Sequence, residues 1–381
     1  MKFELSPELE ELRAAVRKFA EHELEPLARQ MDETGVLPDE VLPLLARQGY
    51  LSVRLPESVG GMGMGLMPYC VMLEELSRTH RIFGQLAFAG GGMTPIAIAR
   101  HGTEEQRRKY LPGLIDGTRR TAFALTEPAG GSDNSAMTTR ADKVDGGWRL
   151  NGRKHFINGA HAADFVMVMA ISDPVKRTRG GVTAFLVDRG TPGFEVTRVD
   201  RALGSHMLAE LTFTDCLVPD SAVIGKVGAG FELAKESLAD GRLGVACSCI
   251  GVADRLLEMA TEHSKQRVTF GKPLAERQAI QWMLADSAVE LTAARALTYE
   301  TLRRYDAGKP LGTNPSMCKL YASEMVGRVA DRAVQIFGGQ GLVRGFPVER
   351  MYRDVRHYRI GEGASEIQRM MIAKELIRGK C

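Results

Sequence analysis

The stretch TAFALTEPAGGSD, residues 121–133, marks the point at which the sequence changes character. Before it, Leu9, Leu12 and Val16 recur at the three- and four-residue spacing of an amphipathic helix. From Thr121 onward the chain runs in short alternating segments separated by Gly, Asp and Pro. The sequence therefore predicts a helical region up to residue 120 and a β region that begins at residue 121.

The helical region carries start signals as well as periodicity. Ser6, Pro7 and Glu8 are typical of an N-cap, a first-turn proline and an acid that complements the helix dipole. Further helical patterns cover residues 41–48, 69–78 and 95 onward, and another helix begins at Thr103 and ends near Gly113.

The β region extends from residue 121 to residue 227. Its predicted strands cover residues 121–125, 148–151, 165–170, 183–188, 194–199 and 210–214. Asn151-Gly152 lies between alternating segments, which predicts a hairpin turn at that position.

Helical spacing returns near Gly228 and continues to the end of the chain. One predicted stripe contains Ile280, Leu284, Ala288, Leu291 and Ala294, and another contains Met325, Val329, Ala333 and Ile336. A four-helix bundle is the simplest arrangement for such helices. We therefore predict a multidomain α+β protein with an all-α N-terminal domain (1–120), a central β-barrel or β-sandwich domain (121–227) and a C-terminal four-helix bundle (228–381).

Composition excludes several function classes. The formal net charge of +3 from nearly balanced acids and bases predicts no nucleic-acid or membrane partner. The first residues form an acidic, helix-like start without a signal or transit pattern, so we expect a cytoplasmic protein. No apolar run approaches the ~18 residues of a membrane helix, and residues 165–171 form the longest. The six cysteines, Cys70, Cys216, Cys247, Cys249, Cys318 and Cys381, are scattered, which predicts reduced thiols and no metal.

The sequence Gly361-Glu362-Gly363 is the first candidate for chemistry. Glycine on both sides lets a flat ligand approach the main chain and leaves one carboxylate on an unencumbered arm, an arrangement that suits a general base. A simple helix–helix connection with a solvated glutamate is the alternative, and this stretch alone favours it.

Two further stretches could hold a ligand. Successive glycines in residues 123–133 can aim main-chain N–H groups at an anion or a ring edge, with Thr126 and Ser132 as hydroxyl donors, although an ordinary hairpin connection fits equally well. In residues 148–160, Phe156 could present a flat face to a ring. His155 is interpreted as a bystander because no carboxylate neighbours it in sequence.

Four motifs, in this order, resemble those of the acyl-CoA dehydrogenases, a flavoprotein family, and the match runs nearly end to end. They are ALTEPAGGSD (124–133), LNGRK (150–154), QRVTFGK (266–272) and AVQIFGG (333–339), the last leading to Arg353-Asp354 and to the Gly-Glu-Gly sequence. The resemblance implies the three-domain fold described above, assembled as a homotetramer (a dimer of dimers) with FAD in each subunit.

The resemblance also implies roles for individual residues. Flavin contacts would come from Phe123, Leu125, Thr126, Gly131, Ser132, Phe156, Ile157 and Asn158. A neighbouring subunit would hold the adenine dinucleotide end with Arg267, Phe270, Gln278, Gln335, Gly338 and Gly339, and Ala364 and Glu366 would approach that end from the C-terminal loop. Arg267 has independent support, because a fixed guanidinium suits a pyrophosphate, although such an arginine is usually solvated.

Glu362 falls where the family's straight-chain members keep their catalytic base. Other members place the base at the position of Gly241, so this chain has a single candidate. The implied reaction removes an α-proton while hydride leaves the β-carbon for flavin N5, and the thioester carbonyl is held by a flavin ribityl hydroxyl and the Glu362 amide. Excluding water should raise the pKa of Glu362 toward working pH.

The substrate side is implied to include Ser132, Arg242 and Gly363, with a helix-end salt bridge as the alternative role of Arg242. Three positions depart from the commonest family pattern. Phe156 replaces a tryptophan and Asn158 a threonine, which leaves the flavin contacts open, and Ala239 replaces an aspartate that helps to hold the coenzyme. Gly361 and the glycine run 90–92 suggest a wide acyl cavity that tolerates branched, cyclic or substituted acyl groups.

We therefore predict an oxidoreductase of fatty acid metabolism that forms a trans-2-enoyl-CoA and passes electrons to an electron-transfer flavoprotein. An acyl-CoA oxidase or an enoyl-CoA reductase of the same family is the first alternative. A non-catalytic flavin-binding or assembly protein is the second, and Glu362 with an intact motif set argues against it. A flavin monooxygenase of the same architecture is the third, in which the resemblance leads us to expect no base at Glu362.

Overall fold

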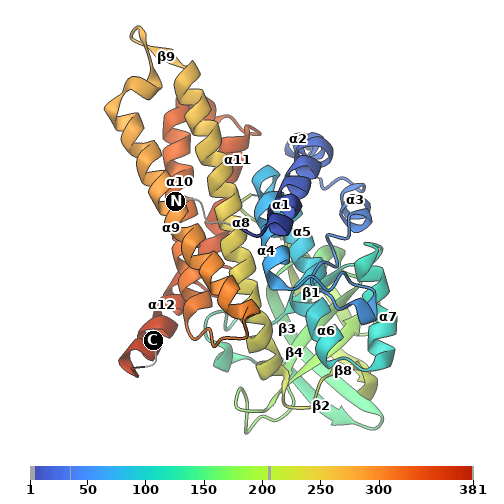
Figure 1. Ribbon diagram of the computed structural model, residues 1–381. Coiled ribbons are helices and arrows are strands. Elements are labelled where there is room, and N and C mark those ends of the chain that lie inside the picture. Colours follow the sequence, from blue (N-terminus) through green and yellow to red (C-terminus); the bar gives the residue numbers. More distant parts are fainter. Residues whose placement is uncertain (1–4, 35, 205–206, 380–381) are drawn as a thin grey trace. The chain divides into compact units, whose positions relative to one another are not determined.

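A computed structural model describes residues 5–34, 36–204 and 207–379 of the chain (Figure 1). Packing divides the chain into two compact units, each assembled from separate stretches of sequence. Unit 1 is drawn from Met1–Val41, Met64–Leu86 and Ala239–Cys381, and unit 2 from Leu42–Gly63 and Ala87–Leu238. The predicted domain boundaries at 120/121 and 227/228 stay predictions, because these units follow packing.

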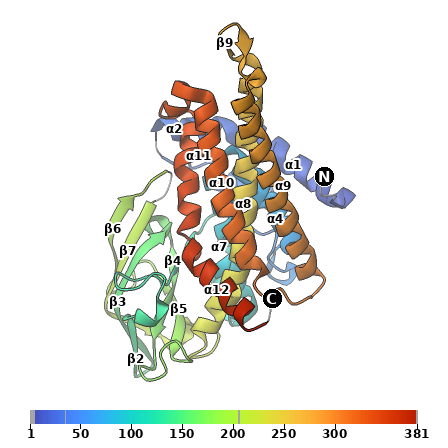
Figure 2. The ribbon, with the colours of Figure 1, turned by 90° about the vertical axis from the view of Figure 1, so that its left-hand side faces the viewer.

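Unit 1 is helical. Its N-terminal part contains α1 (Pro7–Phe19), a π-helical turn (Ala20–Leu24), α2 (Glu25–Thr34), α4 (Leu66–Thr79) and the beginning of α5 (Arg81–Gly91). Its C-terminal part contains α8 (Gly230–Gln266) from Ala239 onward, α9 (Gln278–Asp306), α10 (Asn314–Phe337), α11 (Pro347–Val355) and α12 (Ser365–Ile377). The long helices α8, α9 and α10 run side by side in both views (Figures 1 and 2).

The predicted helix starts are confirmed by their caps. The Ser6 hydroxyl accepts a hydrogen bond from the Leu9 N–H at 3.4 Å, and Pro7 occupies the first helical position of α1. In unit 2, Thr103 and Gln106 exchange reciprocal hydrogen bonds at the start of α7 (Glu104–Ile115). Each cap satisfies backbone donors that the first turn of a helix leaves free.

The two predicted apolar stripes of the bundle are buried to different extents. Met325, Val329, Ala333 and Ile336 on α10 are all buried, as predicted. On α9 only Leu291 and Ala294 are buried, whereas Ile280 and Leu284 are half-buried and Ala288 is exposed. The correct period therefore did not imply a continuous core. In the first half of α9, Arg332 of α10 contacts Ser287 and Glu290, while Trp282 and Val289 stay exposed.

The β region of unit 2 forms one eight-stranded sheet in the order β6-β7-β3-β2-β4-β5-β8, with β1 also pairing with β4. The strands are β1 (Thr121–Ala124), β2 (Arg140–Val144), β3 (Gly147–Asn158), β4 (Phe165–Ile171), β5 (Val182–Asp188), β6 (Phe194–Arg201), β7 (Met207–Pro219) and β8 (Val223–Ile224). The six predicted strands correspond to β1 and β3 to β7, and β2 and β8 were missed.

The sheet buries both of its faces around β4 and β5. On one face, Trp148 of β3 and Phe213 of β7 share a core with Phe185 of β5, so the sheet folds over itself as a barrel or sandwich requires. On the other face, Tyr110 of α7 packs with Phe165 of β4, as do side chains of α6 (Met93–His101). Burial on both faces explains why β4 reads as an unbroken apolar run. The remaining helix of unit 2 is α3 (Val41–Arg47).

The hairpin predicted at Asn151-Gly152 is wrong. Both residues lie inside β3, and the turn between β2 and β3 is at Gly146, which has φ 71°. Asn151 instead accepts a hydrogen bond from the Asp215 N–H at 2.8 Å. Gly152 has φ 149°, and a Cβ there would lie 2.6 Å from the Thr139 Cα. The glycine is needed for close approach to a neighbouring backbone within a strand.

One stretch satisfies the length and hydropathy of a membrane span, contrary to the expectation that none would. It covers Arg81–His101, with a mean hydropathy of 1.4 over its most apolar window, 67% of which is buried inside the protein. Gly92 interrupts it between α5 and α6. A core segment passes the same test, so this finding is weak support for a membrane span, and the absence of a membrane partner stays a prediction.

We expect Gly152→Ala to lower the free energy of unfolding by about 3 kcal/mol, because it combines a disfavoured backbone angle with overpacking against Thr139. Gly146→Ala is the matched control, since its φ is also positive but no atom lies within 4 Å of the added Cβ. It should cost about 1 kcal/mol. Urea unfolding of both variants provides the measurement, and equal losses would contradict the packing explanation.

Candidate active site

A buried ion pair links the first two motifs. Lys154 and Glu127 are 0% and 1% exposed in their side chains, and the Lys154 Nζ lies 2.7 Å from the Glu127 Oε1. Nζ also donates to the Leu125 carbonyl at 3.1 Å. Burial acts to raise the pKa of Glu127, but the Lys154 charge and hydrogen bonds from Lys154, Thr139 and Thr138 outweigh it and lower that pKa to about 2. Burial lowers the pKa of Lys154 to about 8, against the opposing charge of Glu127.

The Glu127 carboxylate also closes the loop that follows β1. Its Oε2 accepts from the Thr138 N–H at 2.6 Å and the Thr138 hydroxyl at 2.7 Å, and its Oε1 accepts from the Thr139 N–H at 3.0 Å. The His155 N–H donates to the Thr126 carbonyl at 2.9 Å. These contacts hold the first motif against β3. Sequence reasoning did not single out Glu127 or Lys154, because the charged and polar residues around Lys154 give no sign that it is buried.

The loop fixed in this way presents unused donors. The N–H groups of Gly131 and Ser132 and the hydroxyls of Thr126 and Ser132 make no hydrogen bond with any described residue. Gly131 and Ser132 are exposed and Thr126 is half-buried. Phe123 and Leu125 beside them are half-buried and pack against the core that α6 and α7 form with β4. This donor set fits the polar edge or the phosphates of the FAD that the resemblance implies.

Phe156 stands out from β3 at an irregularity in the strand. Pairing with β7 shifts register between Lys154 and Ile157, and Phe156 has φ 58° and is 57% exposed. Its ring stacks on His155 at 3.8 Å between centroids. A bulge re-aims a side chain in this way. Phe156 therefore offers the flat surface that the sequence predicted, whereas Ile157 is buried in the core and Asn158 is half-buried.

His155 has a carboxylate neighbour that sequence proximity missed. Glu210 on β7 lies with its Oε2 3.8 Å from the His155 Nε2 and also pairs with Arg153. The absence of a neighbouring carboxylate in sequence therefore does not hold in space, because Glu210 reaches His155 from the next strand, and the interpretation of His155 as a bystander stays a prediction. Arg153 already pairs with that carboxylate, so the contact is part of a surface ion cluster.

In unit 1, Glu362 lies between the short helical turn Arg356–Arg359 and α12. Its backbone has φ 56°, and its Oε2 is buried without a hydrogen bond to any described residue. The Glu362 N–H also donates to none. Burial raises the pKa of Glu362, and the charges of Arg242 and Lys319 oppose that shift. A carboxylate with a buried, unpartnered oxygen differs from the solvated turn residue that the isolated stretch favoured.

Arg242 on α8 lies close enough to the same carboxylate for the two charges to interact. Its Nη2 lies 3.6 Å from the Met371 sulfur, and its Nε is buried without a hydrogen-bond partner in the described residues. Burial lowers the pKa of Arg242, with Glu362 opposing the shift. Within the described chain Arg242 forms no salt bridge, so the helix-end salt bridge considered from sequence is wrong.

The space beside Gly361 is filled. A Cβ at Gly361 would lie 2.6 Å from the His357 Nε2, so the histidine ring occupies the volume that a side chain there would take. A Cβ at Gly90 would lie 3.0 Å from Leu51, and one at Gly92 would lie 2.1 Å from the Phe88 carbonyl. These glycines permit close packing within each unit. The expectation that they widen an acyl cavity is therefore wrong at Gly361 and at Gly90.

The residues predicted for a neighbouring subunit's FAD gather at one end of the bundle. Arg267, Gln278, Gln335, Gly338 and Gly339 are exposed, and Phe270, at the tip of the hairpin of β9 (Val268–Thr269) and β10 (Lys272–Pro273), is 97% exposed with φ 49°. His263 near the end of α8 stacks on Phe337 at the end of α10, which brings both motifs to this end. Ala364 is half-buried and Glu366 exposed at the start of α12.

This end of the bundle is distant from Glu362 within one chain. Lys319 near the start of α10 donates to the Gly363 carbonyl at 2.8 Å, so residues 360–364, here called the base loop, lie beside that part of α10. Gln335 lies sixteen residues further along, which is ~24 Å on a helix that rises ~1.5 Å per residue. One chain therefore does not bring these two residue groups together along α10.

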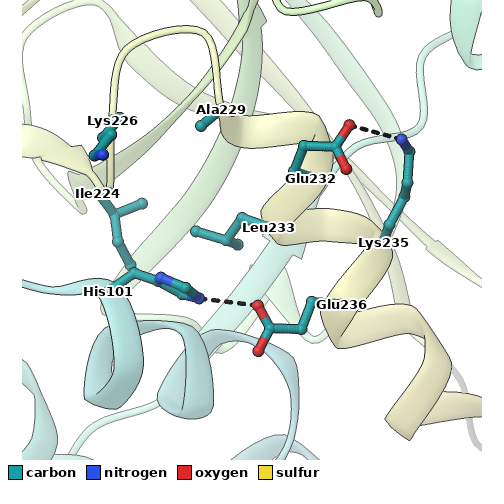
Figure 3. Close-up of a pocket in the computed structure, with 9 residues that line it drawn as sticks. His101, Ile224, Lys226, Ala229, Glu232, Leu233, Lys235 and Glu236 are labelled. Carbon is teal, nitrogen blue, oxygen red and sulfur yellow. Dashed lines mark hydrogen bonds and ion pairs between the residues drawn. The ribbon is translucent and has the colours of Figure 1, made fainter. Parts of the chain in front are cut away.

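A separate hollow of about 750 Å³ lies in unit 2 between α6, the segment after β8 and the first turns of α8 (Figure 3). Its charged side chains are largely paired: Glu236 contacts His101 at 3.0 Å, and Lys235 contacts Glu232 at 2.7 Å. None of the predicted site residues lines it. We therefore do not assign the hollow to the candidate site.

Comparison with known proteins shows matches along almost the whole chain. The N-terminal, middle and C-terminal domains of acyl-CoA dehydrogenases match residues 6–118, 122–216 and 228–377. An acryloyl-CoA reductase (NADH) from Anaerotignum propionicum is 39% identical over 388 residues, covering 99% of this chain and 96% of the relative. The CarC subunit of the caffeyl-CoA reductase–Etf complex from Acetobacterium woodii is 38% identical, covering 96% of this chain and 97% of that relative.

A solved structure with a similar fold is butyryl-CoA dehydrogenase from Megasphaera elsdenii. It is 36% identical in sequence with a TM-score of 0.93, and the alignment covers 99% of this chain and 100% of that one. The predicted fold class, an N-terminal helical region, a central β region and a C-terminal helical bundle, is confirmed by this likeness.

Breaking the Glu127–Lys154 pair should unfold the first motif. We expect Lys154→Met or Glu127→Gln alone to cost about 3–5 kcal/mol, because each leaves a buried charge unpaired, and to strip the protein of bound flavin. The double variant should lose less than the sum of the two. Lys143→Met is the control, since its pair with Asp220 is about half exposed and should be worth less than about 1 kcal/mol. Urea unfolding and visible absorbance measure both effects, and additive losses would contradict the coupling.

Proposed function

Because the chain belongs to the acyl-CoA dehydrogenase family of FAD-dependent oxidoreductases, we propose that it oxidises an acyl-CoA thioester to the trans-2-enoyl-CoA with Glu362 as the base. The observation that carries the proposal is the Glu362 carboxylate, which has one buried oxygen without a hydrogen bond and a pKa raised by burial. A desolvated carboxylate of raised pKa is suited to removing a weakly acidic proton.

Glu362 takes the proton from the α-carbon and holds it on its carboxylate. The free Glu362 N–H is available to the thioester carbonyl, where negative charge develops as the proton leaves. Arg242 and Lys319 keep positive charge near this carboxylate and so favour its ionised form before the reaction. When bound, FAD supplies the oxidant that accepts the hydride from the β-carbon.

The residues of the first two motifs would hold FAD. The free hydroxyls of Thr126 and Ser132 and the N–H groups of Gly131 and Ser132 suit its polar edge and phosphates, and the exposed ring of Phe156 suits its flat face. The same loop places Ser132 where it could also contact the substrate. Ile157 is buried in the core of the sheet, so its role is to pack β3 in place and not to contact FAD.

We propose an electron-transfer flavoprotein as the redox partner, supported by the relative that is named as a subunit of a reductase–Etf complex. The relative named acryloyl-CoA reductase favours a second candidate function, in which the same residues run the reaction from enoyl-CoA to acyl-CoA. Turnover with oxygen, with an artificial one-electron acceptor and with a reduced electron donor separates oxidase, dehydrogenase and reductase.

The five described cysteines are buried and free, which supports a reducing compartment, and we propose the cytoplasm. Cys381 lies outside the described residues.

We further propose a homotetramer, a dimer of dimers, in which one chain's Arg267, Phe270 and Gln335 complete the FAD site of another. Their exposure and the ~24 Å that separates Gln335 from the base loop along α10 support this assignment. An exposed phenylalanine at positive φ is costly in an isolated chain, and a partner that covers it would offset that cost. The exposed Trp282 and Val289 in the first half of α9 are a further apolar surface for assembly.

Glu362→Gln should retain the fold and the yellow colour while lowering kcat by about 10²–10⁴-fold, because the amide keeps the shape and loses the basicity. Since burial raises the pKa of the Glu362 carboxyl, kcat/KM of the unaltered protein should fall on the acid side as that group is protonated. Glu375→Gln on α12 is the control, because within the described residues its carboxylate pairs with Arg378 at the helix end and with no residue assigned to the site. A panel of linear and branched acyl-CoA substrates supplies the assay, and a fully active Glu362→Gln protein on every substrate would reject the assignment.

A shared FAD site predicts complementation between two inactive proteins. Arg267→Ala removes a neighbour's contribution, and Glu362→Gln removes the base, so each homo-oligomer should be inactive. After mixed refolding, a chain that keeps Glu362 meets a chain that keeps Arg267, and one site of that pair is intact. If equal amounts of the two chains pair at random, the mixture should show about a quarter of the activity of the unaltered protein. If the mixture is no more active than either variant alone, Arg267 and Glu362 serve the same chain's site and the shared site is rejected.

A further inference from the structure

Lys319 is a buried cation whose charge no neighbouring carboxylate neutralises by contact. Its side chain is 0% exposed, and its only hydrogen bond within the described residues goes from Nζ to the Gly363 carbonyl at 2.8 Å. An ammonium has three N–H donors, so two remain unused. Burying a charged ammonium without a counter-ion costs free energy of folding. Because this ammonium lies beside the residue that follows the proposed base, a functional role is the natural explanation.

The Gly363 carbonyl receives two donors. Besides Lys319, the Gln368 Nε2 donates to it at 2.9 Å and reaches the Glu362 carbonyl at 3.4 Å. Glu362 and Gly363 both have positive φ, 56° and 86°. Holding one carbonyl from two sides fixes the peptide plane after Gly363, and with it the strained conformation that aims the Glu362 carboxylate and leaves its N–H free.

The groups around Lys319 come from every element packed against it. Arg242 and Cys249 face it from α8, Glu324 from α10, Glu362 from the base loop and His357 from the turn before that loop. Burial raises the pKa of the Cys249 thiol, which stays protonated. Burial and the charges of Arg81 and Lys319 lower the pKa of His357 to about 3, so it stays neutral at working pH.

Glu324 remains ionised under the same conditions, because Arg359 and Arg369 pair with it and its pKa is lowered despite its burial. Arg242 remains charged. Lys319 and Glu362 are therefore the two groups of this cluster whose pKa values burial shifts toward neutral pH, downward for the lysine and upward for the carboxyl.

We propose that Lys319 is a positioning residue of the reaction: its ammonium fixes the base loop through the Gly363 carbonyl, and its positive charge keeps Glu362 ionised in a desolvated site. The proposal rests on the assignment of Glu362 as the base. Lys319 does not touch the substrate in this account, and it acts through the backbone and through the field at Glu362.

The proposal predicts both limbs of the pH profile. Burial lowers the pKa of Lys319 to about 8, with Cys249 and Glu362 acting against that shift. Below that pH the lysine is charged and supports ionised Glu362; above it the lysine becomes neutral and the support is lost. Activity should therefore rise as Glu362 loses its proton and fall again as Lys319 loses its own.

The experiment compares the pH dependence of kcat/KM for the FAD-loaded protein and three variants. Lys319→Arg keeps a charge that is not titrated below pH ~12, so the alkaline limb should move up by at least one pH unit while the acid limb stays in place. Lys319→Met removes the charge, so the acid limb should move to higher pH and kcat/KM at neutral pH should fall about 10-fold or more. Lys374→Arg, an exposed lysine of α12, should leave both limbs unchanged.

A purely structural role would lower activity by the same factor at every pH. An unmoved alkaline limb in Lys319→Arg overturns the proposal, and this readout remains if Lys319→Met fails to fold. Exchange of the substrate α-proton with D₂O, followed in the same variants, should show the same limbs. If Glu362→Gln exchanges that proton normally, the assignment of the base has failed; if only the Lys319 variants keep the unaltered profile, the positioning role alone has failed.

Discussion

The buried pair of Glu127 and Lys154 is the constraint on which the flavin side of the site depends. Two charges removed from water are stable only when hydrogen bonds satisfy their remaining atoms. The loop of residues 125–139 supplies them: Glu127 accepts from Thr138 and Thr139, and Lys154 donates to the Leu125 carbonyl. The pair and the loop therefore form together, and the free donors of Gly131 and Ser132 are displayed as a result.

Unit 1 contains a second buried lysine, Lys319, whose surroundings differ from those of Lys154. Lys154 has a carboxylate partner at contact distance, so its charge is neutralised and its role is complete in the folded chain. Among the described residues the Lys319 ammonium contacts only a carbonyl oxygen, and both Glu362 and Arg242 beside it keep unpartnered polar atoms. A closed pair stabilises structure, whereas an open cluster of unsatisfied charges has affinity left for a ligand. This difference separates the scaffold of the site from its reactive part.

Sequence reasoning recovered what local periodicity encodes. It found the helix caps at Ser6 and Thr103 and the stripe on α10, because these depend on neighbours in the chain. It failed where a distant backbone decides the conformation: Gly152 is a glycine because Thr139 lies against it, and the carboxylate beside His155 comes from β7. For the site, the four motifs suggested residues that stay predictions, Lys319 lies in none of the motifs, and nothing in LNGRK indicated that Lys154 is buried.

Backbone strain identifies the candidate site independently of motifs. Five non-glycine residues in the described chain have positive φ: Phe156, Arg177, Asp215, Phe270 and Glu362. Two are held by hydrogen bonds of their own backbone: the Arg177 N–H donates to the Asp173 carbonyl and its carbonyl accepts from the Gly181 N–H, and the Asp215 N–H donates to the Asn151 side chain across the sheet.

The other three are residues that the motifs had assigned to FAD or to proton removal. Strain of this kind costs about 1–3 kcal/mol per residue and persists where the surroundings enforce it. Around Glu362 the enforcing contacts are those of Lys319 and Gln368 with the Gly363 carbonyl. The loop is therefore held in this conformation before any substrate arrives, which is the condition under which the proposed base, a single carboxylate, can act efficiently.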